Sequence, residues 1–275
     1  MAAPLSCITA RKSFRPRLAL PNLQLSCYRL QSFNSEGRLM SLQEKTSLLL
    51  VAPRALVCCD SVMAQRLVQT FGQLAEPRKR SRTQQPASLI QFSQVDTHDP
   101  DGLKALFASV GPIDHLVGAA TGATRTTAPF MDQTDDQFRA AFDKFWGYTH
   151  VVRTGVPFLS ENASITLVSG TPARRCNPGM ISVSCTGCAV EGLVRALAKE
   201  LAPRRVNAVA PGIIDTPMFD HFGDKKAATM AAIGKGMPLG RVGLPEEVAE
   251  ALMLAMANHY MTGVVIDIDG GALLA

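Results

Sequence analysis

Short apolar runs rich in β-branched residues alternate with longer stretches of helical periodicity from about Met40 to the end of the chain. Such alternation predicts parallel strands joined by right-handed helical crossovers, with helices on both faces of the sheet. The sequence therefore predicts an α/β fold, a doubly wound (Rossmann-like) parallel sheet. The predicted strands are Leu48–Ala52, Leu89–Val95, His115–Ala120, Ser164–Val168, Val206–Ala210 and Val264–Ile268. The predicted helices are Val62–Phe71, Asp101–Ser109, Asp132–Val152, Val183–Leu201 and Pro245–Ala257.

The length of 275 residues and the hydrophobic share of 47% predict a large buried core and exclude a disordered or fibrous chain. No internal stretch has the composition of a linker between two domains. We therefore expect one domain over residues 41–275, preceded by an extension over residues 1–40.

Charge is uneven along the chain. Residues 1–40 hold six basic residues and one acidic residue, and the basic and acidic residues of the remainder balance. A neutral body that is 6% aromatic offers neither the basic surface nor the stacking side chains of a nucleic-acid-binding protein. The basic extension has the composition of an organelle transit peptide, with an unstructured extension as the alternative. We expect a cytoplasmic protein, or an organellar one if residues 1–40 are a transit peptide.

Two sequence features bear on membranes and metals. The most apolar stretch, Ser47–Cys59, is interrupted by Pro53 and is too short to span a bilayer, so no membrane insertion is expected. The seven cysteines form no disulfide framework. Cys185 and Cys188 have the CxxC spacing of a metal or redox site, but no second pair accompanies them. We expect no metal, and we interpret both as small buried residues of a packed helix.

In open α/β sheets, ligands bind beyond the carboxyl ends of the strands. Ser169 follows one predicted strand, the turn Pro211–Pro217 follows the next, and Asp96 follows an earlier one. These segments are the first candidates for a functional site.

Four segments carry a family resemblance: SITLVSG, AVEGLVRALAKELAPRRVNAVAPGIIDTPMF, PLGRVGLPEEVAEAL and TGVVIDIDGG. In this order and spacing, they resemble the C-terminal half of the classical short-chain dehydrogenases/reductases. Weaker matches, VDTHDPDGLKALF and IDHLVGAATG, extend upstream. The resemblance implies hydride transfer between a nicotinamide and a small-molecule substrate, and a homo-oligomer (dimer or tetramer).

The catalytic pair of that family is absent. The family uses a Ser, a Tyr and a Lys four residues after the Tyr, and alignment places Val183 and Gly187 at the last two positions. No tyrosine of the chain is followed by lysine at that spacing. Ser169 and Lys144, at or near the family's Ser and helix Asn, remain as candidate catalytic residues. The alternative for Lys144 is a structural role, bonding sheet carbonyls or facing solvent.

The phosphate-binding turn of the family is altered as well. Cys58, Val62 and Ala64 stand at its three glycine positions, and the following stretch is short enough that a strand is missing. The N-terminal half is therefore shortened or degraded relative to the family. A basic run within it, containing Arg78 and Arg80, is either a clamp for the 2′-phosphate of NADP(H) or a solvated loop.

Further cofactor contacts follow from the resemblance. Asp96 would contact the adenine, and Thr216 the nicotinamide amide or the phosphates. The alternatives are a turn-capping role for Asp96 and an N-cap role for Thr216. The other candidate contacts in this turn are Pro211, Gly212 and Ile214.

Together these features predict an NADP(H)-linked oxidoreductase that acts on a small organic, specialised-metabolite-type substrate. The expected pocket is lined by Ser169, Gly170, Val183, Gly187, Ile214 and Met218. Because an apolar pocket can orient a reactive substrate without acid–base groups, a non-redox cyclase or isomerase is an alternative. A second alternative is a non-catalytic oligomer partner that packs through the helix Val183–Leu201.

Overall fold

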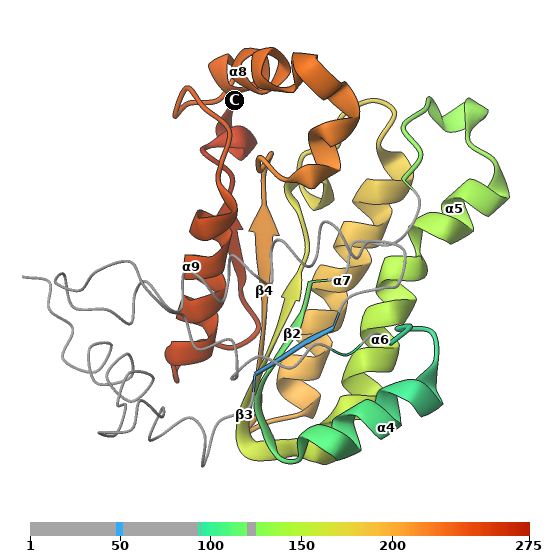
Figure 1. Cartoon of the computed structure of the whole chain (residues 1–275), viewed down its shortest axis with the longest axis vertical. Helices are drawn as coiled ribbons and strands as arrows, with labels where there is room; N and C mark the ends of the chain where they lie inside the picture. The colour runs from blue at the N-terminus through green and yellow to red at the C-terminus, as the bar shows by residue number, and fades with distance from the viewer. Residues whose placement is uncertain (1–47, 52–92, 94, 120–124) are drawn as a thin grey trace, which may run out of the picture.

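The computed structural model describes residues 48–51, 93, 95–119 and 125–275. In this part of the chain, a five-stranded parallel sheet runs in the order β1-β2-β3-β4-β5. Helices cover both of its faces, with α9 on one side and α6 and α7 on the other (Figure 1). The predicted parallel α/β sheet is thus confirmed. The strands are β1 (Leu48–Val51), β2 (Ile113–Gly118), β3 (Leu159–Val168), β4 (Arg205–Pro211) and β5 (Val265–Ile268).

Alternating side chains of the strands build two cores. On one face, Leu116, Leu167 and Ala208 pack with residues of α4 (Pro100–Val110), α6 (Asp143–Gly155) and α7 (Ile181–Glu200). On the other face, Val168 and Val209 pack against α9 (Pro245–Ala257). Because successive residues of a strand point to opposite faces, near-continuous apolar strands are what a sheet covered on both sides requires.

The predicted helix Asp132–Val152 is wrong as one element. The structure has a 3₁₀ turn, η3 (Phe130–Asp132), then α5 (Asp135–Ala141) and α6, which are separated at Phe142. A capping box starts α5, since the Thr134 hydroxyl accepts from the Gln137 N–H and the Gln137 side chain accepts from the Thr134 N–H. The T-x-x-Q spacing was the sequence signal for this start.

Other boundaries shift by smaller amounts. Helix α7 begins two residues before Val183, and β3 begins at Leu159, earlier than predicted. Helix α8 (Lys226–Lys235) was not predicted; with η6 (Pro217–Lys225), it lies above the carboxyl end of the sheet (Figure 1). The predicted helix Val62–Phe71 and most of the predicted strand Leu89–Val95 lie outside the described residues, as does the extension over residues 1–40.

Among the described residues, one helix, α7, has the length and apolar composition of a membrane span. Its buried residues, such as Val190 and Val194, belong to the core next to the sheet. The apolar character of α7 therefore follows from its place in the core of the fold.

Candidate functional site

A pocket of about 200 Å³ opens at the carboxyl ends of β3 and β4. All six residues expected to line a pocket do so: Ser169, Gly170, Val183, Gly187, Ile214 and Met218. Two backbone bonds continue the sheet beyond the strand ends and fix this edge. The Ser169 N–H donates to the Val209 carbonyl at 2.8 Å, and the Gly212 N–H donates to the Ile268 carbonyl at 2.9 Å.

Two walls of the pocket differ in origin. The helix wall consists of Lys144 of α6, Val183 and Gly187 of α7, and the loop Ser169–Ala173. The turn wall is the segment Pro211–Thr216, which follows β4. Two of the three strand-end segments singled out in the sequence therefore reach the same pocket, because parallel strands end at one edge of the sheet, whereas Asp96 does not line it.

Lys144 lines the pocket and reaches the end of β3. Its Nζ donates to the Ser169 carbonyl at 3.2 Å and lies 5.7 Å from the centroid of the Tyr148 ring. The expected structural role, a bond to a sheet-edge carbonyl, is thus present together with exposure to the pocket. An ammonium has three donors, so this bond by itself does not exhaust them.

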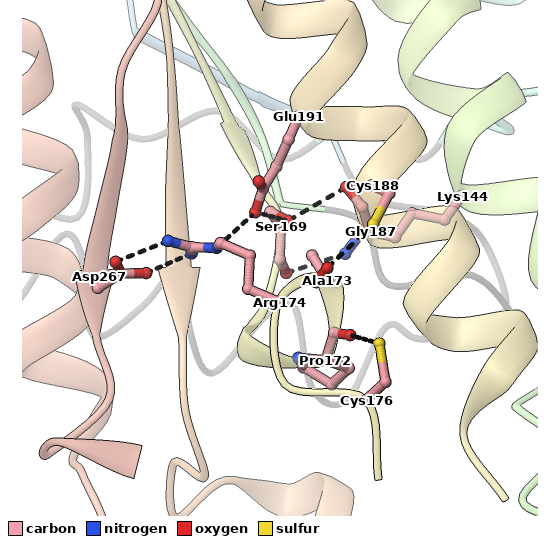
Figure 2. Close-up of polar contacts among 10 residues, drawn as sticks. All are labelled: Lys144, Ser169, Pro172, Ala173, Arg174, Cys176, Gly187, Cys188, Glu191 and Asp267. Atoms are coloured by element: carbon pink, nitrogen blue, oxygen red, sulfur yellow. Dashed lines mark hydrogen bonds and ion pairs between the residues drawn. The ribbon is translucent and has the colours of Figure 1, made fainter. Parts of the chain in front are cut away.

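The Ser169 hydroxyl is directed at α7. Its Oγ donates to Glu191 Oε1 at 3.2 Å, with the Gly187 carbonyl at 3.5 Å (Figure 2). Glu191 is buried, and Arg174 Nε lies 3.3 Å from the same carboxylate oxygen. Arg174 in turn holds Asp267 of β5 through both of its terminal nitrogens, with Nη1 at 2.7 Å from Oδ2.

Gly187 and Ala173 are in close contact. A Cβ added at Gly187 would lie 2.8 Å from the Ala173 Cβ and 3.2 Å from its Cα. The Cys188 Sγ, one residue along, donates to the Ala173 carbonyl at 2.9 Å. A lysine at position 187, the predicted position of the family's Lys, is therefore excluded by the loop that packs against α7.

The turn wall is held by the segment that follows β5 and by α8. A Cβ added at Gly212 would lie 2.8 Å from the Cα of Asp269, so the residue directly after β5 packs closely against the turn. Lys226 of α8 donates to the Thr216 carbonyl at 3.1 Å and pairs with Asp215 and Asp220 at 2.9 and 2.7 Å. The hydrogen bonds with the two aspartates raise the pKa of Lys226, and the bond with Asp220 contributes more than the bond with Asp215.

The remaining cofactor candidates are placed as follows. Thr216 lines the pocket and is the N-cap residue of η6, as the alternative expected, but its side chain makes no capping hydrogen bond. Pro211, Gly212 and Ile214 also line the pocket. Asp96 is exposed and accepts from the His98 N–H at 2.9 Å, which is the expected turn-capping contact. Arg78 and Arg80 lie outside the described residues.

The charged side chains of the described lining are both cations. Arg125 and Lys144 line the pocket, and none of the described lining residues is an acid, a histidine or a tyrosine. Arg125 Nη1 lies 3.4 Å from the sulfur of Met218, which also lines the pocket. The described lining therefore offers positive charge and apolar surface to a ligand.

Sequence reasoning missed Glu191, Arg174 and Asp267. Glu191 could have been found, since it falls on the buried stripe of α7 with Ser184, Gly187 and Val194, a spacing that normally carries apolar or small residues. Arg174 and Asp267 are distant in sequence and had no such signal. A buried carboxylate needs a hydrogen-bonding or charged partner. The buried position of Glu191 therefore indicates that such a partner exists, but not which residue it is.

The interpretation of Cys185 and Cys188 as buried is wrong. Both are exposed, because they lie off the stripe of α7 that faces the sheet. Partial burial and then the nearby Glu191 raise the pKa of the Cys188 thiol, which disfavours the thiolate needed for metal or redox chemistry. Among residues that the structure describes, no group of three His, Cys, Asp or Glu side chains is arranged to hold a metal ion.

Comparison with known proteins agrees on the family. The profile of the enoyl-(acyl carrier protein) reductase family matches residues 63–272. A short-chain dehydrogenase/reductase of Stachybotrys chlorohalonatus is 32% identical over 228 residues, which is 79% of this chain and 89% of the relative. The 3-oxoacyl-[acyl-carrier-protein] reductase of Thermotoga maritima is 37% identical over 190 residues, or 66% of this chain and 76% of the relative.

Solved structures extend the likeness to the fold. A small-chain dehydrogenase crystallised in complex with NADPH superimposes with a TM-score of 0.68 at 29% identity, covering 84% of this chain and all of the other. The MalC reductase/Diels-Alderase of Malbranchea aurantiaca gives a TM-score of 0.67 at 26% identity, covering 83% of this chain and 88% of that one. With the family profile spanning most of the chain, these findings show that this protein belongs to the short-chain dehydrogenase/reductase family.

Proposed function

We propose that the chain is an NADP(H)-linked oxidoreductase that reduces a carbonyl group of a small organic, specialised-metabolite-type substrate. The observation that carries this proposal is the position of Lys144, whose ammonium lines the pocket beside the end of β3. Among the described residues of the helix wall, Lys144 is the titratable side chain that lines the pocket, because Val183 and Gly187 stand at the predicted Tyr and Lys positions of the family.

The turn wall fits the nicotinamide end of the cofactor. Thr216 presents a hydroxyl that caps no helix, and Ile214 supplies apolar surface beside it. The cations Arg125 and Lys144 suit the negative charge of a dinucleotide. When bound, NADPH supplies the hydride of the reaction. Arg78 and Arg80 remain the proposed contacts of the 2′-phosphate, and Asp96 that of the adenine.

Lys144 then does the work that the family gives to its Tyr and Lys. A carbonyl oxygen gains negative charge as its carbon is reduced, and a nearby ammonium stabilises this charge and can donate the proton. The same two cations disfavour a substrate that is itself cationic. A neutral carbonyl compound is therefore the substrate class that these charges support.

Apolar side chains favour a small hydrophobic substrate skeleton. Val183, Ile214, Met218 and Phe219 surround the polar groups of the pocket. Similar proteins include a 3-oxoacyl-[acyl-carrier-protein] reductase and a reductase/Diels-Alderase, so reductases are among them by name. Both support a substrate with a carbonyl group in an apolar frame.

The first test is a titration of the full chain with NADPH and with NADH, followed by cofactor fluorescence and by quenching of the lone Trp146. We expect saturable binding with preference for NADPH, weakened by Arg78→Ala combined with Arg80→Ala. A folded chain that binds neither cofactor at millimolar concentration would overturn the proposal.

The second test concerns Lys144. Lys144→Met is expected to lower the rate of NADPH-dependent carbonyl reduction about 100-fold, because acid–base assistance is typically worth about 10²–10⁴ in rate. Lys144→Arg keeps the charge but not a proton that can be donated, and is expected to retain substrate binding with a low rate. Equal rates for all three proteins would remove Lys144 from the mechanism.

One observation favours a second candidate function, a non-redox cyclase or isomerase. The Ser169 hydroxyl bonds Glu191, so the described helix wall has fewer proton-transfer groups than a typical reductase of this family. Transfer of deuterium from labelled NADPH to product separates the two candidates. Product without deuterium would support the non-redox function, in which the pocket acts by orienting the substrate.

A further inference from the structure

The Ser169 hydroxyl donates its proton to a hydrogen bond within the protein. A serine hydroxyl has one proton and two lone pairs. Among the described residues, the hydrogen-bond partners of Oγ are Glu191 Oε1 at 3.2 Å and the Gly187 oxygen at 3.5 Å, and both are acceptors on α7 (Figure 2). The hydroxyl therefore donates toward α7, whichever of the two it prefers.

Glu191 is fixed as the acceptor by a chain of alternating charges. Its side chain is 7% exposed, and Arg174 Nε lies 3.3 Å from the oxygen that Ser169 bonds. Arg174 is held in place by Asp267, with Nη1 at 2.7 Å from Oδ2. If the Ser169 proton turned to the pocket, a buried carboxylate would lose one of its donors, and unsatisfied buried charges are costly.

Ser169 also lines the pocket, so it meets a ligand with the remaining lone pairs of Oγ. The neighbouring donor is Lys144, whose Nζ lies 3.2 Å from the carbonyl of the same serine. The pocket thus places a hydrogen-bond acceptor and a cationic donor around one residue. A ligand that bonds with both carries a hydrogen-bond acceptor and a hydrogen-bond donor close together.

From this geometry we propose that the pocket is specific for carbonyl compounds with a hydroxyl or N–H group on the neighbouring carbon, the simplest being α-hydroxy ketones. The substrate carbonyl accepts from Lys144, and the neighbouring O–H or N–H donates to Ser169 Oγ. Glu191 is the positioning residue, because it fixes Ser169 as an acceptor. This inference rests on the proposed function and names the substrate class of the same pocket.

The test compares 2-hydroxycyclohexanone with 2-methoxycyclohexanone, which keeps the oxygen but lacks the donor. Dissociation constants are measured by ligand-observed NMR on the full chain with NADP⁺ added. We expect the hydroxy ketone to bind about fivefold tighter, in line with one hydrogen bond. Glu191→Met removes the nearer of the two acceptors of the Ser169 proton, so the hydroxyl can turn to donate to either probe and the preference is expected to decrease.

Two variants keep the test decisive. Glu200→Gln changes an exposed carboxylate of the same helix and is expected to keep the fivefold preference. Ser169→Ala removes the acceptor and is expected to abolish the preference even if Glu191→Met does not fold. A preference retained in Ser169→Ala, or equal binding of both probes to the unaltered chain, would overturn the proposal.

Cofactor binding separates this inference from the proposed function. If the chain binds NADPH but neither probe at up to tens of millimolar, the substrate class is wrong and the oxidoreductase proposal stands. If the chain binds neither NADPH nor NADH, the proposed function itself fails.

Discussion

The helix wall and the turn wall of the pocket are held by different kinds of contact. In the helix wall, buried groups fix the loop Ser169–Ala173 to α7, through the Gly187–Ala173 contact and the Ser169–Glu191 bond. In the turn wall, half-exposed ion pairs of Lys226 join the segment Pro211–Thr216 to α8. The first wall holds Val183 and Gly187, the predicted positions of the family's Tyr and Lys, and the second holds the predicted cofactor contacts Ile214 and Thr216.

The packing of the helix wall bears on the prediction that Gly187 stands at the Lys position of the family. Ala173 occupies the place where a side chain at position 187 would begin, so the loop leaves no space for a longer residue there. In the turn wall, Thr216 and Ile214 line the pocket, and their cofactor role stays a prediction.

The strongest way to break this comparison is to restore the family pair. Val183→Tyr combined with Gly187→Lys is expected to destabilise the fold by about 3 kcal/mol or more, because the new Cβ meets Ala173 before the rest of the lysine is placed. We expect no gain in reductase activity. Denaturant unfolding and an NADPH oxidation assay measure the two effects.

Gly192 provides the matched control on the same helix. An added Cβ there meets nothing within 4 Å, so Gly192→Ala is expected to stabilise the fold by about 0.5–1 kcal/mol through helix propensity. Gly187→Ala should instead destabilise it. If both alanine variants stabilise the chain, the helix wall is not closed as described.

The dependence of stability on pH tests the sheet core independently of the pocket walls. His115 of β2 is partly buried beside Ser164, with Nδ1 and Oγ 2.8 Å apart, and this loss of contact with water lowers its pKa from 6.5 to about 4. The unfolded chain then binds the proton more readily, so stability is present above pH 6.5 and falls as the pH drops toward 4, by up to about 3 kcal/mol.

His115→Asn is expected to flatten this part of the stability curve relative to the unaltered chain. Urea unfolding at several pH values between 4 and 7 measures the difference. If the two curves run parallel, the acid sensitivity comes from other groups, and the charges of the helix wall become the first candidates.

The smallest effect is expected in the turn wall. Lys226→Met removes ion pairs whose side chains are partly exposed, so the free energy of unfolding should fall by less than about 1 kcal/mol. Because Lys226 also bonds the Thr216 carbonyl, NADPH affinity should fall about threefold. A loss of stability as large as that of the Gly187 variant would mean that the two walls are held alike.

Strand and helix positions followed from the sequence because each covered strand needs a near-continuous apolar run and each helix an apolar stripe. The residues lining the pocket could be predicted because strand ends are local features of the sequence. The sequence prediction missed the break at Phe142 because the apolar periodicity continues across it. It missed the start of α5 because that start is marked by the Thr134 capping box and not by the apolar periodicity.

The sequence by itself determined the α/β sheet and the family, since these depend on residue order and spacing alone. The loss of the Tyr and Lys stays a prediction from the alignment. The tertiary structure decided why the lysine cannot be accommodated and where the Ser169 proton points. Both depend on contacts between segments distant along the chain: Ala173 with Gly187, Ser169 with Glu191, and Arg174 with Asp267. Such contacts arise from the packing of α7 against the sheet and its loops, and local periodicity carries no information about them.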